Sequence, residues 1–269
     1  MDFKKRQSLI KEENFHDAWA DSINIDEIMV DESFEACTAP ENRLVIKRLG
    51  GLKGKKVLDL GCGAGEASVY FAKKGADVTA ADNSDGMLRV VQQVAKKFGV
   101  SLTVQKSCSH EIGCKDGTFD IVYAANLLHH VDIERTLAEV RRVLKKGGVF
   151  VSWDPLAYNP LIRAYRRIAK EVRTQDEHPI TMRDLEIFKR YFSRVEVETT
   201  WLLTLWVFVK LYLFDRIDPN KIRYWKLVLS KHKKLETIYR PLEKIDTVIL
   251  RFFPFLKRYC WNVVIFSSK

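Results

Sequence analysis

Three glycines at alternate positions, Gly61, Gly63 and Gly65, follow a short apolar run that ends at Leu60. Such a run is typical of a buried strand, and the glycines allow the backbone to turn sharply and to approach a ligand closely. An acidic residue, Asp82, closes the next apolar run, at about the spacing that places a carboxylate on ribose hydroxyls. The pattern predicts a nucleoside-containing ligand on a doubly wound sheet.

Two ligand classes compete for this loop. A dinucleotide fold requires G-x-G-x-x-G, with the pyrophosphate at the helix N-terminus, whereas this chain reads G-x-G-x-G followed by Glu66. A carboxylate at that point would repel a pyrophosphate but tolerate a cationic ligand. Asp59, inside the strand end, can orient the loop or reach an ammonium group. An oxidoreductase is therefore the weaker interpretation.

These features resemble the first motif of class I S-adenosylmethionine-dependent methyltransferases. Three further stretches resemble later motifs in the family's order, namely residues 81–88, residues 119–131 and residues 144–151, the last as a hairpin into the fifth strand. The resemblance covers roughly residues 55–155. It implies S-adenosylmethionine as cofactor and a Rossmann-like α/β fold. In that fold a doubly wound seven-stranded sheet is mostly parallel and its last strand is antiparallel.

The resemblance also implies the cofactor contacts. Asp82 is expected on the ribose and Met87 near the adenine. The other expected contacts are Asp59, Gly61, Cys62, Gly63, Asn83, Cys108, Ser109 and Asn126. The chain departs from the family where an acidic residue and a small one usually hold the adenine amino group, because residues 107–110 read Ser-Cys-Ser-His. Ser109, Cys108 and a backbone carbonyl are the candidates for that contact.

Histidines supply the candidate catalytic groups. Methyl transfer needs an acceptor held about 3 Å from the methyl group with water excluded, and a hydroxyl acceptor also needs a base. The base must lie at the carboxyl ends of the strands. The candidates are His129 after the fourth expected strand, His178 in the polar loop after the fifth, and His16 near the N-terminus. The competing interpretations are a packed helix-start histidine for His129 and a solvated loop for His178.

The chain divides into four expected parts. Residues 1–50 form a helical leader over the cofactor and acceptor site, or an ordinary amphipathic helix packed on the sheet. Residues 51–200 form the S-adenosylmethionine-binding Rossmann-like domain, residues 201–258 a basic, aromatic helical cap inserted between the last two strands, and residues 259–269 the final strand. After the first strand, further strands are expected at 77–82, 101–105, 119–125, 149–153, 195–200 and 259–267.

The net charge of +10 is concentrated in the C-terminal third. Residues 201–269 carry 14 Lys and Arg against 5 Asp and Glu, whereas the first 200 residues carry 31 against 30. The apolar run at 201–214 is shorter than the roughly 20 residues that span a bilayer, and it contains Lys210. It is expected to be a buried cap helix. Peripheral contact with an anionic membrane is the alternative, and nucleic-acid binding ranks lowest.

The five cysteines show no paired metal-ligand spacing, which predicts reduced thiols and no metal site. The first residues lack the apolar core of a signal peptide, so a cytoplasmic location is expected, with peripheral membrane attachment as the alternative. The expected function is a methyltransferase for a small-molecule, apolar or lipid-like acceptor, with O-methylation favoured. The alternative is a degenerate scaffold that docks a partner or a membrane surface through its basic cap. The intact glycines and Asp82 favour the enzyme.

Overall fold

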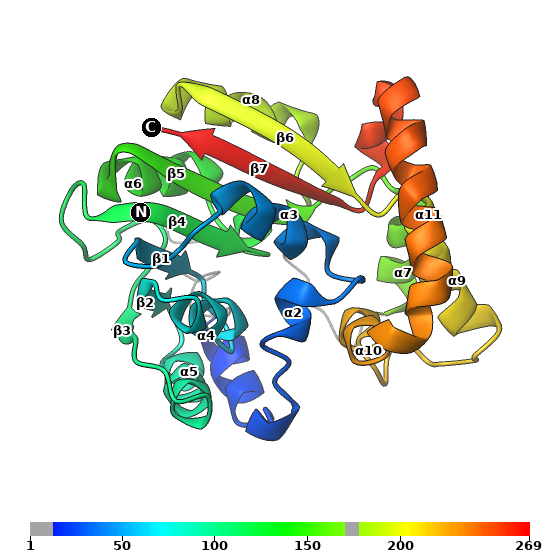
Figure 1. The fold of residues 1–269 in the computed structure, drawn as a ribbon, viewed down its shortest axis with the longest axis horizontal. Helices are drawn as coiled ribbons and strands as arrows, with labels where there is room; N and C mark the ends of the chain where they lie inside the picture. The colour runs from blue at the N-terminus through cyan, green and yellow to red at the C-terminus, as the bar shows by residue number, and fades with distance from the viewer. Residues whose placement is uncertain (1–12, 170–177) are drawn as a thin grey trace.

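The computed structural model describes residues 13–169 and 178–269. A seven-stranded sheet in the order β3-β2-β1-β4-β5-β7-β6 forms its centre (Figure 1). The strands are β1 (Lys56–Leu60), β2 (Asp77–Asp82), β3 (Thr103–Lys106), β4 (Phe119–Ala125), β5 (Leu144–Pro155), β6 (Arg194–Thr200) and β7 (Asn262–Ser268). β1 to β5 pair in parallel, and β7 is antiparallel to both β5 and β6. The predicted doubly wound sheet with an antiparallel last strand is confirmed.

Helices connect the strands. Their bounds are α2 (Glu32–Glu35), α3 (Pro40–Leu49), α4 (Glu66–Lys73), α5 (Asp85–Lys97), α6 (Ile133–Val143), α7 (Pro160–Ile168), α8 (Met182–Tyr191), α9 (Trp206–Leu213), α10 (Tyr224–Ser230) and α11 (His232–Phe252). Short 3-10 turns are η1 (Ile25–Glu27), η2 (Leu128–His130), η3 (Leu203–Leu205) and η4 (Pro254–Tyr259). The predicted hairpin at residues 144–151 is wrong. β5 is one strand from Leu144 onward, and a register shift between Phe119 and Ile121 of β4 accommodates the extra residues.

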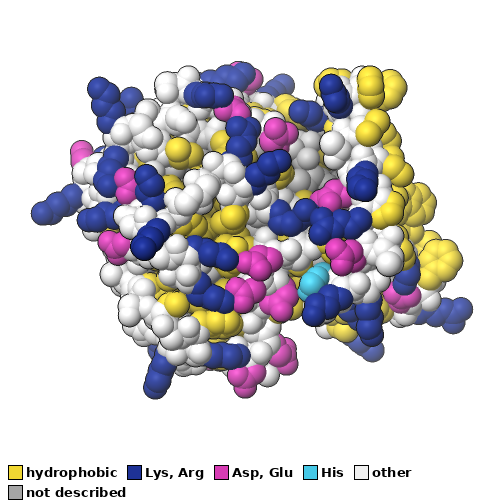
Figure 2. All heavy atoms as spheres, viewed as in Figure 1, with side chains coloured by type: hydrophobic (Ala, Val, Ile, Leu, Met, Phe, Trp, Pro, Cys, Tyr) yellow, Lys and Arg dark blue, Asp and Glu magenta, His cyan; other side chains and the backbone are white. Residues whose placement is uncertain are grey.

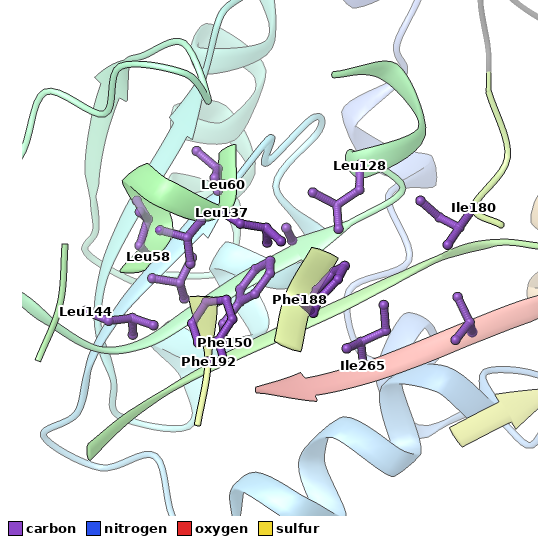
Figure 3. Packing of buried hydrophobic residues seen from close by; sticks show 14 of the residues in the cluster. Leu58, Leu60, Leu128, Leu137, Leu144, Phe150, Ile180, Phe188, Phe192 and Ile265 are labelled. Atoms are coloured by element: carbon purple, nitrogen blue, oxygen red, sulfur yellow. The ribbon is translucent and has the colours of Figure 1, made fainter. Parts of the chain in front are cut away.

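The side chains of the central strands alternate between two apolar layers. Leu58 of β1 belongs to the layer under α6 and α8, and its neighbour Val57 belongs to the layer under α3, α4 and α5. Figure 3 shows the first layer, in which the ring of Phe150 stacks on Phe188 and Phe192 with centroid separations of 6.1 and 5.9 Å. Both faces of the sheet are therefore covered, and its strand ends are left as the place for a ligand.

We call residues 201–258 the cap segment. Its helices α9, α10 and α11 lie with α7 beyond the end of the sheet to which β4 points (Figure 1). They share an apolar core that includes Trp201, Phe208, Tyr224 and Tyr239. The described helices include none that is both long and apolar enough to cross a membrane.

One buried carboxylate joins the start of the cap segment to α11. Asp246 accepts hydrogen bonds from the backbone N–H groups of Leu202, Leu203 and Thr204, at 3.1, 2.7 and 3.1 Å. The hydroxyl of Thr204 donates a fourth at 2.9 Å. Because α9 follows η3 directly, these bonds hold α11 and α9 in one arrangement.

Candidate active site

The glycine-rich loop leaves the carboxyl end of β1 and enters α4. Gly61, Gly63 and Gly65 all have positive φ angles, of 72°, 51° and 88°. A Cβ atom on Gly61 would lie 2.9 Å from a methyl carbon of Leu127, and one on Gly65 would lie 2.9 Å from a methyl carbon of Val91. The backbone conformation therefore favours glycine at both positions, and at Gly65 the stiff, branched side chain of Val91 leaves no space for a Cβ atom either.

Asp82 lies at the end of β2 beside this loop. One carboxylate oxygen accepts the N–H of Gly63 at 2.9 Å, and the other accepts the N–H of Ser84 at 3.0 Å. Two backbone donors thus fix the carboxylate, and its remaining lone pairs are able to accept bonds from a ligand's hydroxyls. This is the arrangement that the sequence predicts for a ribose site.

Two adjoining pockets open at the strand ends. The lining of the smaller pocket includes Asp82, Asn83, Ser107, Cys108 and Ser109. The lining of the larger pocket includes Asp59, Cys62, Glu66, His129, Trp201 and Phe208. Both linings share His16, Gly61, Gly63, Asn126 and His130. One ligand can therefore place a nucleoside in the smaller pocket and extend past the glycine loop into the larger one.

The structure does not bring two predicted site residues to either pocket. The side chain of Met87 is fully buried in the core, because the first turn of α5 directs it between that helix and the sheet. The lining of the two pockets therefore does not support the predicted adenine contact of the Met87 side chain. His178 has an exposed side chain outside both linings, and only its backbone N–H reaches the site region, where it donates to the carbonyl of His129 at 2.9 Å.

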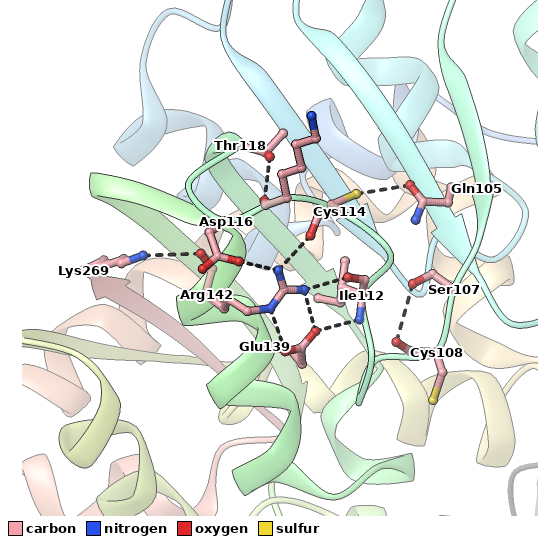
Figure 4. Close-up of polar contacts among 11 residues, drawn as sticks. Gln105, Ser107, Cys108, Ile112, Cys114, Asp116, Thr118, Glu139, Arg142 and Lys269 are labelled. Carbon is pink, nitrogen blue, oxygen red and sulfur yellow. Dashed lines mark hydrogen bonds and ion pairs between the residues drawn. The ribbon is translucent and has the colours of Figure 1, made fainter.

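The loop expected at the adenine end is held by an ion pair on α6 (Figure 4). Arg142 donates to the carbonyls of Ile112 and Cys114, each at 2.7 Å, and pairs with Glu139 at 2.8 Å. Glu139 in turn accepts the N–H of Ile112 at 2.8 Å. Sequence reasoning missed this network, for which the only signal is the i, i+3 spacing of the two charges. It fixes the segment that follows Cys108.

An N-terminal helix over residues 13–20 borders both pockets. The carboxylate of Asp17 accepts the hydroxyl of Ser84 at 2.5 Å and the N–H of Gly86 at 2.9 Å, at the N-terminus of α5. The hydrogen bond from Ser84 lowers the pKa of Asp17 the most, and the one from Gly86 lowers it further. They hold the helix so that His16 contributes to both linings.

A histidine and an aspartate form a buried pair beside the larger pocket. The Nδ1 atom of His129 lies 2.7 Å from the Oδ1 atom of Asp154, which also accepts the His129 backbone N–H at 3.3 Å. The Oδ2 atom of Asp154 has no hydrogen-bond partner among the described residues. Burial raises the pKa of the Asp154 carboxyl. The arrangement orients the imidazole through one ring nitrogen, as an acid–base histidine requires.

Two acids of the larger pocket, the buried Asp59 and the half-buried Glu66, lie on either side of the glycine loop. Asp59 is 2% exposed, accepts the hydroxyl of Ser68 at 2.5 Å, and has a pKa that burial raises to about 7. Burial also raises the pKa of Glu66, which lines the same pocket. A cationic ligand would favour the ionised form of these carboxyls. The donor set therefore fits a nucleoside that carries positive charge near the glycine loop.

Aromatic rings from the cap segment, together with Trp261 just before β7, complete the larger pocket. The rings of Trp201, Phe208 and Trp261 contact one another with centroid separations of 5.0 to 5.8 Å. On another part of the lining, Arg223 lies over the ring of Trp19 at 4.3 Å. This pocket offers an acceptor a largely apolar surface close to His129.

Comparison with known proteins agrees with this geometry. Residues 58–152 match a family model described as a methyltransferase domain. The ubiquinone biosynthesis O-methyltransferase of Cronobacter sakazakii is 36% identical over 116 residues, which are 43% of this chain and 48% of that protein. The sterol 24-C-methyltransferase of Saccharomyces cerevisiae is 29% identical over 168 residues, 60% of this chain and 44% of that protein. The chain thus spans about half the length of these relatives.

Two solved structures show the same fold. One is a phosphoethanolamine N-methyltransferase 2 of Haemonchus contortus in complex with S-adenosylhomocysteine. The alignment covers 85% of this chain and 52% of that protein's chain, with a TM-score of 0.56 at 19% identity. The other is the magnesium protoporphyrin IX methyltransferase of Synechocystis, also with S-adenosylhomocysteine bound. The alignment covers 86% of this chain and 83% of that protein's chain, with a TM-score of 0.51 at 16% identity. Sequence motifs, strand order and loop geometry agree: residues 58–152 form a methyltransferase domain of the class I S-adenosylmethionine-dependent type, whose methyl donor is S-adenosylmethionine.

Proposed function

We propose that this protein methylates a small, apolar or lipid-like acceptor, with a hydroxyl oxygen as the favoured site. The buried pair of His129 and Asp154 beside the larger pocket is the observation that carries the proposal. S-adenosylmethionine, when bound, supplies a methyl group on a sulfonium. The protein's own contribution is to bind both reactants, exclude water and move one proton.

The smaller pocket would hold the nucleoside. Asp82 accepts the ribose hydroxyls, and Asn83, Cys108 and Ser109 surround the base end. The positively charged end of S-adenosylmethionine would face Asp59 and the backbone of the glycine loop, which includes Gly61. Cys62 and Asn126 are proposed to contact the cofactor as well, since Cys62 lines the larger pocket and Asn126 lines both pockets.

His129 would act as the general base. A neutral imidazole that donates from Nδ1 to Asp154 carries its lone pair on Nε2, where it can accept the proton of an acceptor hydroxyl. Asp154 then stabilises the imidazolium that forms. His178 is not proposed for this role because its side chain lies outside the larger pocket. His16 lines the pocket and is proposed to help enclose the reactants.

The acceptor class follows from the lining and from the relatives. Trp201, Phe208 and Trp261 present apolar rings to the larger pocket, which favours an acceptor with an apolar body. Two relatives are named for ubiquinone biosynthesis and for sterol methylation, and both names agree with such an acceptor. We also propose a cytoplasmic location, because the five cysteines are free thiols in the structure and three are buried.

Methyl transfer into an extract tests the proposal. The full chain is incubated with S-adenosylmethionine labelled in its methyl group and an organic extract of its source cells, and label in the organic phase is counted. We expect His129→Ala to lower turnover by about a hundredfold or more, with unchanged affinity for S-adenosylhomocysteine. Asp154→Asn should lower it by a comparable factor because the imidazole loses its orientation. His178→Ala is the matched control and should retain full turnover.

Three results would contradict the proposal. If the unmodified protein transfers no label into the organic phase, the proposed apolar acceptor is wrong. Full turnover of His129→Ala would show that positioning alone carries the reaction. Equal losses in His129→Ala and His178→Ala would show that the effect does not depend on the larger pocket.

A further inference from the structure

α11 carries two apolar faces, and only one of them packs against the protein. Leu235, Tyr239 and Leu250 are buried on the inner face. On another side of the helix, Ile238, Ile245, Val248 and Phe252 are exposed. Their spacings of 7, 3 and 4 residues place them in one continuous stripe. The stripe ends at Phe252, which is 71% exposed.

The stripe continues into the neighbouring elements. Phe253 and Phe255 follow directly and are 52% and 66% exposed. α9 contacts α11 and presents Trp206 and Leu213, seven residues apart and therefore on one side, to the exterior. Phe214 at the end of α9 is 77% exposed. Figure 2 shows hydrophobic atoms gathered along the edge of the molecule that α11 and α9 form.

We call this set of side chains the apolar edge: Trp206, Leu213, Phe214, Ile238, Ile245, Val248, Phe252, Phe253 and Phe255. Contiguous exposed apolar surface of this kind marks an interaction site in a folded protein. α9 itself is two-sided, since Phe208 lines the larger pocket while Trp206 faces outward. The cap segment is thus apolar both toward the site and toward the exterior.

Basic residues accompany the apolar edge. Arg251 lies next to Phe252, and Lys257 and Arg258 follow Phe255. The chain contains no Asp or Glu after Asp246, which is buried in its bonds to η3. The charge that residues 247–258 contribute around the end of α11 is therefore positive, with no acidic side chain in that stretch to offset it.

We propose that the apolar edge docks on the surface of an anionic phospholipid bilayer. The exposed rings enter the boundary between headgroups and acyl chains, and the adjacent Lys and Arg side chains attract the lipid phosphates. This attachment is independent of methyl transfer. It requires no spanning helix and leaves the sheet in water.

A second copy of the chain fits this surface less well. A symmetric dimer would bring the Arg251 and Lys257 side chains of both copies to one interface, where like charges repel. An acidic lipid surface complements the same charges. The observed combination of exposed aromatic rings and uncompensated positive charge therefore favours lipid.

Vesicle sedimentation with the full-length protein tests the docking. The vesicles contain phosphatidylcholine alone or phosphatidylcholine with about one third phosphatidylglycerol, at low and high salt. We expect binding to the anionic vesicles that salt weakens several-fold. Replacing Phe252 and Phe253 together by serine should lower the partition coefficient by about tenfold or more, because the inserted apolar area is lost. Replacing both by leucine should retain most of the binding.

A charge variant has its own matched control. Lys244 is exposed and directly precedes Ile245 of the apolar edge. Lys244→Ser combined with Arg251→Ser should weaken binding to anionic vesicles and leave binding to neutral ones unchanged. Lys96→Ser combined with Lys146→Ser removes the same charge from exposed positions outside the cap segment and should have little effect. Far-ultraviolet circular dichroism and the melting temperature establish that each variant is folded.

The proposal is overturned if the unmodified protein does not sediment with either vesicle type. It is also overturned if the serine and leucine pairs bind equally, or if the two charge variants behave alike. Sedimentation equilibrium provides the remaining outcome: a dimer that the serine pair dissociates would make the apolar edge an interface between copies and would refute docking on lipid.

Discussion

The affinity for S-adenosylmethionine should depend on the protonation of Asp59. Burial raises the pKa of this carboxyl from 3.8 to about 7 in the unliganded protein. The ionised form is the one that a sulfonium and an ammonium group would stabilise. Binding should therefore take a proton off Asp59, and affinity should rise with pH up to the pKa and then level off.

The magnitude follows from the ionised fraction. With a pKa of about 7, Asp59 is about 3% ionised at pH 5.5 and about half ionised at pH 7. If only the ionised form binds tightly, the dissociation constant should fall roughly fifteenfold across this range. The ligand's own amino group stays protonated there, since α-amino groups titrate near 7.7–8.0.

Isothermal titration calorimetry at several pH values measures this dependence. Repeating the titration in buffers of different ionisation enthalpy gives the number of protons released. Asp59→Asn should bind more weakly and with little dependence on pH in this range. Glu66→Gln removes a second carboxyl that is half-buried in the same pocket. It should keep the pH dependence with a somewhat lower midpoint, because the charge of Glu66 contributes to the raised pKa of Asp59. A pH-independent affinity in the unmodified protein would refute the reasoning.

The same carboxyl affects stability. A raised pKa in the folded state means that the folded protein holds a proton that the unfolded chain has already lost between about pH 4 and pH 7. Asp59 therefore contributes stability below its unfolded pKa of 3.8, and that contribution is lost as the pH rises through about 7. A bound cation should offset the loss.

Three further substitutions test separate parts of the structure. Asp82→Ala should weaken S-adenosylmethionine binding by about 1.5–3 kcal/mol in calorimetry, because a carboxylate that accepts ribose hydroxyls is removed, and unchanged affinity would contradict the ribose site. Gly65→Ala should destabilise the fold by about 2–4 kcal/mol in urea unfolding, since it combines a φ of 88° with a contact at 2.9 Å to Val91; Gly99→Ala, with positive φ and open space, should cost only about 1 kcal/mol. Asp246→Ala should cost about 3 kcal/mol by leaving three backbone N–H groups without their acceptor, and a loss below about 1 kcal/mol would contradict its role in joining α11 to η3.

The glycine loop and the sheet were predictable because their signals are local. Gly61 and Gly65 stand where the backbone requires positive φ, and the apolar runs before them have the length of strands. Asp82 closes its strand, so the parallel arrangement alone brings it beside the loop. These features depend on the order of elements along the chain, which the sequence states directly.

Side-chain direction and register were harder to predict. Met87 follows the N-cap Ser84 by three residues, and local sequence does not decide whether that position of the first turn faces the ligand or the core. The pairing of His129 with Asp154 depends on the register of β4 and β5, in which Ala125 lies opposite Trp153. His178 contacts His129 through a backbone hydrogen bond, and its side chain lies outside both pockets. Such placements follow from tertiary packing.

The cap segment shows a third limit. The run at 201–214 was expected to be a buried helix, yet Trp201 is buried with a positive φ of 67° and Trp206 is largely exposed. Apolar residues recur on two faces of α11, so the sequence does not indicate which face is buried. The contacts of α11 with η3 and α9 decide which face packs inside. Composition therefore indicated an apolar, basic segment without indicating which side is exposed.

A crystal structure of the full chain with S-adenosylhomocysteine would show directly whether the two pockets form one cofactor site. The two adjoining pockets predict one orientation. The ribose hydroxyls should lie on Asp82, the adenine should lie beside Cys108 and Ser109, and the sulfur should point past the glycine loop into the larger pocket near His129. A ligand that lies wholly in the larger pocket, or one whose ribose does not contact Asp82, would contradict this cofactor site.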